Sequence, residues 1–186
     1  MPQICGIIYV DGFAIMSKIL LAVILSFFGL NSLGQTKKPP RFADYPAAQK
    51  FRGKASAINF HSCSLARMFR TRLRDTVSIG PNFAGHYAVN SWGCGTECIQ
   101  IGIVDLQNGN VYMPGFSAQA GVDTRANSRL LIVNPPARLK ELYGEGPLPD
   151  DYFQTRYYLW NGRELELIYP VELKGKIRNI LKSCEP

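Results

Sequence analysis

Residues that commonly carry catalysis or metal binding are scarce in this sequence. Its 186 residues include two histidines and five cysteines. The common catalytic motifs are also missing: there is no Gly-rich phosphate loop, no G-x-S-x-G nucleophile elbow and no H-E-x-x-H metal-binding helix. No repeat or low-complexity segment stands out. These absences lower the expectation of an enzyme without excluding one.

Long apolar runs are lacking too. The run over residues 19–30 is shorter than the about 20 residues that span a bilayer. Lys18 precedes it and small residues follow, as in a secretory signal peptide. We therefore expect residues 1–34 to be a signal region cleaved after Gly34, export to the periplasm or beyond, and no stable membrane span afterwards. Residues 1–15 fit no signal peptide, so we interpret them as a gene-model extension before Met16.

Removing residues 1–34 also removes Cys5 and leaves an even number of cysteines. The four that remain are Cys63, Cys94, Cys98 and Cys184. An even number in an exported chain indicates two disulfides, for which three pairings are possible. We favour Cys94–Cys98 and Cys63–Cys184. On the loop-entropy model the long bridge contributes nearly 5 kcal/mol and the short one about 2 kcal/mol, so the long bridge is the main stabiliser.

Acidic residues are fewer than basic ones, and the formal net charge is +7. This excess favours acidic partners such as phospholipid headgroups or anionic glycans, and we expect no nucleic-acid partner. The polar, proline-bearing residues 35–41 read as a tether. The remaining residues 42–186 have the length of one ordinary domain.

Periodicity predicts an α+β fold. Residues 43–51 and 64–76 are expected as short helices, the second with Leu65, Met68, Phe69 and Leu73 on its apolar side. Its other face is rich in arginine and is interpreted as solvated, with phosphate binding as the alternative. An antiparallel, hairpin-rich sheet of five or six strands follows, stapled by the disulfides. An Asn-Gly pair at 161–162 predicts a tight hairpin turn. Strands are expected at 84–92, 98–106, 111–113, 128–133, 155–160 and 163–169, loops at 114–127 and 135–154, and a terminal helix at 174–181.

The stretch from residue 80 to 98, G-P-N-F-A-G-H-Y-A-V-N-S-W-G-C-G-T-E-C, holds the best site candidates. Strand alternation places a histidine, an asparagine and a tryptophan on one face, which is more polar than a core usually is. The expected binding residues are His86, Asn90, Trp92, Thr96 and Glu97. The competing interpretation makes His86 a buried histidine bonded to backbone.

The Cys94–Cys98 pair is interpreted as a structural disulfide, because redox pairs have two intervening residues and a βαβ setting. A zinc site would need both cysteines together with His61 and His86, and no finger spacing fits; we expect no metal and no cofactor. Other candidates are the carboxylates and two aromatics, Tyr158 and Trp160, that share a strand face. The carboxylates are Glu97, Asp105, Asp123, Asp150 and Asp151, of which Asp105 reads as a turn residue.

Several motifs together resemble an uncharacterised family of small exported bacterial proteins. They are F-x-T-R-L-R near Phe69, G-P-N-F-A-G-H-Y, W-G-C-G-T-x-C, I-V-D-x-x-N-G-x-V-Y, S-R-L-L-I-V-N-P and Y-Y-L-W-N-G. The resemblance covers residues 64–168 and implies export and a shared fold, but no activity. The chain departs from the family at Asn127, where relatives often have an Asp.

Two functions are compatible with these observations. The leading one is an exported, non-catalytic module that binds a partner in the envelope or outside the cell, because no catalytic motif accompanies the signal region and the paired cysteines. The alternative is a small exported hydrolase or thiol enzyme that uses His86 with Cys94 or with a carboxylate.

Overall fold

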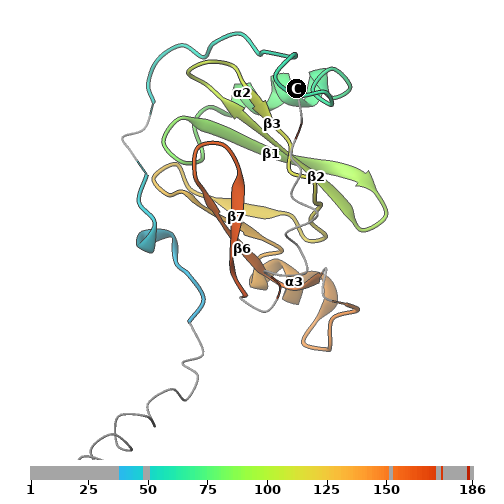
Figure 1. Ribbon diagram of the computed structural model, residues 1–186. Coiled ribbons are helices and arrows are strands. Elements are labelled where there is room, and N and C mark those ends of the chain that lie inside the picture. Colours follow the sequence, from blue (N-terminus) through green and yellow to red (C-terminus); the bar gives the residue numbers. More distant parts are fainter. Residues whose placement is uncertain (1–37, 48–50, 151–152, 171–172, 174–183, 185–186) are drawn as a thin grey trace, which may run out of the picture. The chain divides into compact units, whose positions relative to one another are not determined.

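The computed structural model describes residues 38–47, 51–150, 153–170, 173 and 184 (Figure 1). The expected signal region at residues 1–34, with the extension expected at 1–15, and the expected terminal helix at 174–181 lie outside these residues. From Pro39 onward the chain forms one compact unit. Its elements are η1 (Phe42–Asp44), α2 (Arg70–Ile79), β1 (Tyr87–Gly95), β2 (Cys98–Asp105), β3 (Val111–Tyr112), β4 (Val122–Thr124), β5 (Leu130–Val133), α3 (Pro136–Tyr143), β6 (Arg156–Trp160) and β7 (Leu165–Tyr169).

The first sheet is antiparallel, with the strand order β1-β2-β3. β1 and β2 form a long hairpin that pairs Tyr87 with Asp105 at one end and Gly95 with Cys98 at the other. The isoleucines of β2 alternate as the sequence predicts, and Ile101 and Ile103 are fully buried on the face that packs on the second sheet.

The second sheet is also antiparallel, with the order β4-β5-β6-β7. All four residues of β5 are buried, as expected for a strand covered on both faces. The predicted Asn-Gly turn joins β6 to β7, where Asn161 Oδ1 accepts hydrogen bonds from the backbone N–H groups of Arg163 and Glu164.

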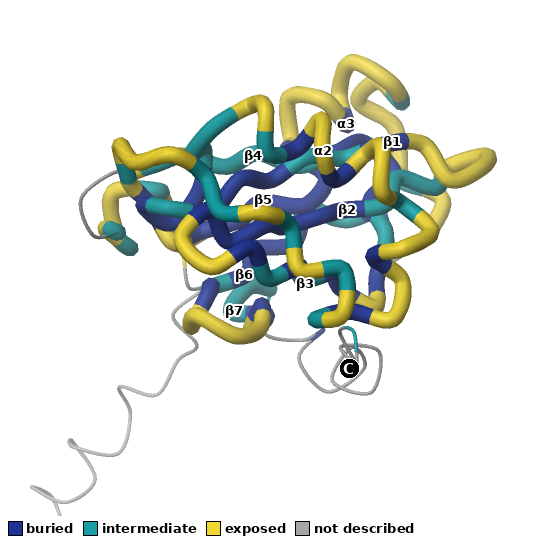
Figure 2. The backbone as a smooth tube through the Cα atoms, turned by 90° about the horizontal axis from the view of Figure 1, so that it is seen from above, coloured by how far each residue is buried: buried dark blue, intermediate teal, exposed yellow. Residues whose placement is uncertain are grey.

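Buried side chains form three layers around these sheets, and Figure 2 shows the strands as the buried interior. The largest cluster lies between the two sheets and includes Phe83, Ile103, Tyr158 and Trp160. A second cluster joins α2 to the outer face of the first sheet. A third covers the outer face of the second sheet, where η1 and the chain that follows it pack. This layered arrangement leaves the ends of the β1–β2 hairpin at the periphery.

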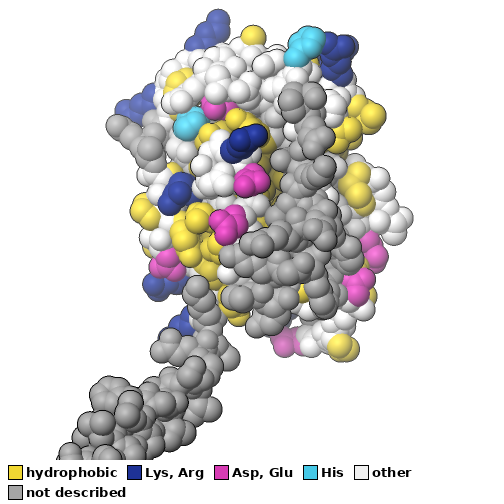
Figure 3. Space-filling view, viewed as in Figure 1, with side chains coloured by type: hydrophobic (Ala, Val, Ile, Leu, Met, Phe, Trp, Pro, Cys, Tyr) yellow, Lys and Arg dark blue, Asp and Glu magenta, His cyan; other side chains and the backbone are white. Residues whose placement is uncertain are grey.

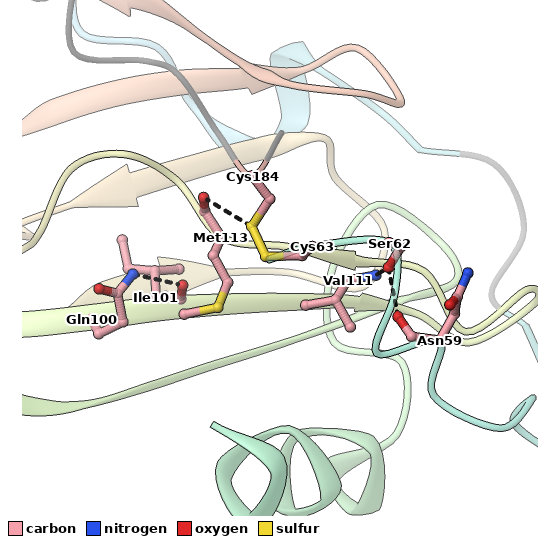
Figure 4. The surroundings of a disulfide bond; sticks show 8 residues. All are labelled: Asn59, Ser62, Cys63, Gln100, Ile101, Val111, Met113 and Cys184. Atoms are coloured by element: carbon pink, nitrogen blue, oxygen red, sulfur yellow. Dashed lines mark hydrogen bonds between the residues drawn. A yellow bond between two sulfur atoms is a disulfide. The ribbon is translucent and has the colours of Figure 1, made fainter. Parts of the chain in front are cut away.

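Both favoured disulfides are present, Cys63–Cys184 and Cys94–Cys98, with Cα–Cα distances of 4.8 and 5.1 Å. Cys63 is fully buried in the second cluster, and Cys184 Sγ lies 3.9 Å from Met113 O (Figure 4). The long bridge closes a sequence separation of 121 residues and the short one a separation of 4. The larger stabilisation is therefore expected from Cys63–Cys184.

The α+β class is as predicted, but the expected single sheet of five or six strands is wrong: the described residues form seven strands in two sheets. The expected loop 114–127 contains β4, and the expected loop 135–154 contains α3. β4 has three residues and pairs with the next strand, β5, and so short a strand has too little alternation to be recognised from local periodicity.

The expected helices also differ from the observed ones. Residues before α2 form turns with three-residue hydrogen bonds, from Ala66 N to Cys63 O and from Met68 N to Leu65 O. Leu65 and Met68 are therefore 41% and 75% exposed instead of buried. Of the helix expected at 43–51, the described residues show η1 alone, and Phe51 N bonds Gly85 O outside any helix.

Candidate functional site

The G-P-N-F-A-G-H-Y motif folds into a tight turn that leads into β1. Asn82 pins this turn: its Nδ2 donates to Val89 O at 2.8 Å and its Oδ1 accepts from Val89 N at 2.7 Å. Phe83 is fully buried, and Ala84 and Gly85 have φ values of 43° and 87°. Glycine adopts such a left-handed φ without strain. The turn thus fixes the position of His86, the residue that follows Gly85 and precedes β1.

His86 lies beside Asp105, which pairs with its neighbour Tyr87 across the hairpin. His86 Nε2 is 3.7 Å from Asp105 Oδ1, and the two side chains are 24% and 5% exposed. The same Asp105 oxygen accepts the Gln107 N–H at 2.8 Å, so Asp105 is a turn residue, as predicted, and also a neighbour of the histidine. The His86 ring centroid lies 4.2 Å from that of Tyr87.

Aromatic rings continue inward from His86. Tyr87, Tyr112 and Trp160 contact one another edge to face, with both tyrosine centroids 5.1 Å from that of Trp160. Tyr112 and Trp160, whose rings Tyr87 contacts, line a small pocket, which we call the aromatic pocket. Its lining residues are Ile103, Tyr112, Pro114, Phe116, Trp160, Arg163, Glu164 and Leu165. The β6–β7 turn thereby brings a cation and an anion to the rim of an apolar hollow.

We use the name His86 end for His86, Tyr87, Asp105, Tyr112 and the aromatic pocket. Figure 3 shows histidine, acidic and basic side chains around a hydrophobic patch on this face. Burial raises the pKa of the Tyr87 hydroxyl, the Trp160 indole partly offsets this rise, and the Asp105 charge adds to it. Burial and then the Asp105 charge also raise the pKa of Tyr112. Both phenols therefore stay protonated as hydrogen-bond donors at neutral pH.

The opposite end of the hairpin, residues 93–98, is here called the disulfide tip. The Cys94–Cys98 bond closes it, and Thr96 and Glu97 are exposed in the turn. Glu97 has a φ of 52°. The tip thus presents the side chains of Thr96 and Glu97 to solvent.

Asn90 and Trp92 lie between the two ends and do not complete an exposed patch. Trp92 is 7% exposed, because its ring packs on Phe69 at 5.4 Å in the cluster under α2. A Cβ atom on Gly102 would meet the same ring, so the glycine makes room for it. Asn90 is half-buried, and its Oδ1 accepts the Ser91 N–H at 2.8 Å. The five expected binding residues are thus split between two ends and a buried middle.

The geometry separates His86 from Cys94. Eight residues of extended strand span about 26 Å, and Cys94 is held in a disulfide. The residues that a zinc site would need are therefore not together, because His86 is at one end of the hairpin and Cys94 and Cys98 are at the other. The described residues contain no group of three or more His, Cys, Asp or Glu side chains that could hold a metal ion. Of the other expected carboxylates, Asp123 lies 3.7 Å from Arg138, Asp150 is exposed, and Asp151 lies outside the described residues.

Three residues of the His86 end escaped sequence reasoning: Tyr112, Arg163 and Glu164. They come from β3 and from the β6–β7 turn, which are brought together by the packing of the two sheets. The Asn-Gly pairs at 108–109 and 161–162 could have indicated these residues, because each pair marks a turn and so places the residues that flank it at the end of a strand. Tyr158 and Trp160 share a strand face as expected, and they are fully buried in the core between the sheets.

Comparison with protein-family models, with curated proteins and with solved structures gave no match. Among the described residues, neither helix has the length and apolar character that crossing a membrane requires. The function is therefore argued from the geometry of the site.

Proposed function

We propose that the protein is an exported, non-catalytic module that binds a partner in the cell envelope or outside the cell through the His86 end. One observation carries this proposal: a surface with an aromatic-lined hollow bears a few convergent polar groups. Arg163 and Glu164 line the hollow, and His86 with Asp105 lies next to Tyr87, whose ring contacts the lining rings of Tyr112 and Trp160. The hollow measures about 10 Å³, room for about one water molecule, so the proposed contact is with the surface around it, where aromatic side chains adjoin a few polar groups as they do in binding sites.

Two further features support export and binding. The four cysteines described form two disulfides, which is typical of proteins that fold in an oxidising compartment. The net charge of +7 favours an anionic partner. The resemblance to a family of exported bacterial proteins points the same way. The partner class we propose is an envelope or extracellular molecule with an anionic group and an apolar or sugar-ring surface for the aromatic rim.

The test uses the purified mature protein against envelope extracts and anionic glycan arrays. Binding is expected for the wild type and for Glu97→Ala at the disulfide tip, and it is expected to weaken about tenfold or more in Arg163→Ala and His86→Ala. Both His86 and Arg163 are accessible to solvent, so these variants are expected to fold. If the wild type retains no ligand, or if Glu97→Ala alone loses it, the proposal fails.

One observation favours a second candidate, a small exported hydrolase. His86 Nε2 lies 3.7 Å from Asp105 Oδ1, longer than the about 2.6–3.2 Å of a hydrogen bond, and such contacts shorten when a substrate binds, which would let the carboxylate orient a histidine base. The thiol version of this idea loses support, because Cys94 is bonded and lies at the other end of the hairpin. A broad hydrolase screen of the wild type against His86→Ala tests this candidate, and equal rates would end it.

A further inference from the structure

A second charged feature lies on the α2 side of the first sheet, away from the aromatic pocket. The segment Ile58–His61, Arg67 and the start of α2 line an open groove of about 430 Å³. Three arginines line it, Arg67, Arg70 and Arg74, together with His61 and apolar side chains. Sites for small ligands typically measure about 300–1,000 Å³, so the groove has room for a charged group and part of the molecule that carries it.

The three arginines reach the groove from α2 and from the turns that precede it. Arg70 and Arg74 are four residues apart and are neighbours on the surface of α2. Arg67 lies in the turns before α2 and lines the same groove. Two of the guanidinium groups rest against aromatic rings. Arg67 Nη2 is 3.1 and 3.0 Å from the two ring nitrogens of His61, and Arg70 Cζ lies 6.0 Å from the centre of the Phe60 ring. Such contacts limit the freedom of flexible side chains and preorganise them.

The charge of this region is uncompensated. Residues 45–96 contain seven Lys or Arg and one Asp, a net charge of +6 out of +7 for the whole chain. The ion pairs within the described residues lie elsewhere, at Arg41–Asp44, His86–Asp105, Arg138–Asp123 and Lys140–Glu145. No carboxylate lines the groove. Three neighbouring guanidinium groups repel one another, and an anion placed between them would relieve that repulsion.

We propose that this groove binds a phosphoryl group, at a site separate from the His86 end. A phosphate monoester carries a charge of about −1.5 to −2 and three strong acceptor oxygens. Arginine donates two parallel N–H groups to such an anion, a geometry that lysine does not reproduce. The phosphoryl group comes from one of two sources, the headgroup of an anionic phospholipid or a soluble phosphate, and both have the same chemistry at the arginines.

The experiment measures binding of the purified mature protein to three probes. They are inorganic phosphate, glycerol 3-phosphate, and phosphatidylcholine vesicles with and without phosphatidic acid. The variants are Arg67→Ala, Arg70→Ala and Arg74→Ala. The matched control is Arg72→Ala, which removes the same charge from an exposed position of the same helix that does not line the groove. Arg70→Lys keeps the charge and removes the fork of parallel donors.

We expect each groove variant to weaken binding about tenfold, which corresponds to the loss of one charge-assisted contact, and Arg72→Ala to change it less than about twofold. Arg70→Lys should fall between the two. Binding of the soluble probes identifies a soluble ligand, whereas binding restricted to vesicles with phosphatidic acid identifies a lipid headgroup. If no probe binds, or if Arg72→Ala weakens binding as much as Arg70→Ala, the groove is not a phosphoryl site.

Discussion

The two ends of the β1–β2 hairpin are held by different means. At the His86 end, the Asn82 amide bonds both backbone groups of Val89, and aromatic rings pack behind His86. At the disulfide tip, a covalent bond closes a turn whose side chains face solvent. The first end has the aromatic pocket beside it, whereas the second presents exposed side chains around its disulfide. The comparison teaches that the Gly- and Cys-rich stretch 80–98 contains two separate structural features, the turn anchored by Asn82 and the turn closed by the disulfide. The candidate site lies beside the first of them.

Breaking the anchor of the His86 end is expected to have the largest effect. Asn82→Ala leaves Val89 N and Val89 O, which belong to a buried residue, without their hydrogen-bond partners. The free energy of unfolding should fall by about 2–4 kcal/mol, measured by urea denaturation. Asn108→Ala is the control, because Asn108 accepts one backbone hydrogen bond in an exposed turn. A loss below about 1 kcal/mol for Asn82→Ala would contradict the anchoring role.

Opening the disulfide tip is expected to cost less. The double variant Cys94→Ser/Cys98→Ser frees a loop with a sequence separation of 4 residues, worth about 2 kcal/mol on the loop-entropy model. Hydrogen exchange should increase for the amides of residues 93–98 and stay unchanged at Tyr87 and Leu106. Faster exchange at the His86 end as well as at the disulfide tip would show that the stability of one end depends on the other.

Alkaline pH should weaken the His86 end by a smaller amount. Burial raises the pKa of Tyr87 and Tyr112, so the folded protein keeps phenol protons that the unfolded chain loses near pH 10. The folded state then binds more protons, and the free energy of unfolding falls as pH rises above about 10. In Tyr87→Phe this decline should be shallower than in the wild type, by urea denaturation between about pH 8 and pH 11. An unchanged slope would contradict the assigned burial of Tyr87.

Much of the fold is predictable from local patterns. The alternating isoleucines of β2, the Asn-Gly turn at 161–162 and both disulfides are present as predicted. The division into two sheets is not predictable: every pair joins consecutive strands, and no local pattern shows that the pairing is interrupted between β3 and β4. α3 was missed for a different reason: Pro135 and Pro136 read as a loop, although proline is well suited to the first turn of a helix, where Pro136 lies.

The site was predicted less well than the fold. His86 could be singled out from its motif, but strand alternation also put Trp92 on the same face, and the packing of α2 buries that face. Arg163 and Glu164 come to the site from a hairpin far along the chain. The site combines residues of β1, β3 and the β6–β7 turn. Whether these elements come together depends on how the two sheets pack, which a single sequence does not directly show.

The central claim is that the His86 end, and not the disulfide tip, contacts the partner. The most direct test replaces either Glu164 or Glu97 by the photo-reactive residue p-benzoylphenylalanine in the producing cells and looks for cross-linked adducts after irradiation. We predict a discrete adduct from position 164, which lines the aromatic pocket, that disappears when His86→Ala is added, and none from position 97. An adduct from position 97 alone would contradict the account.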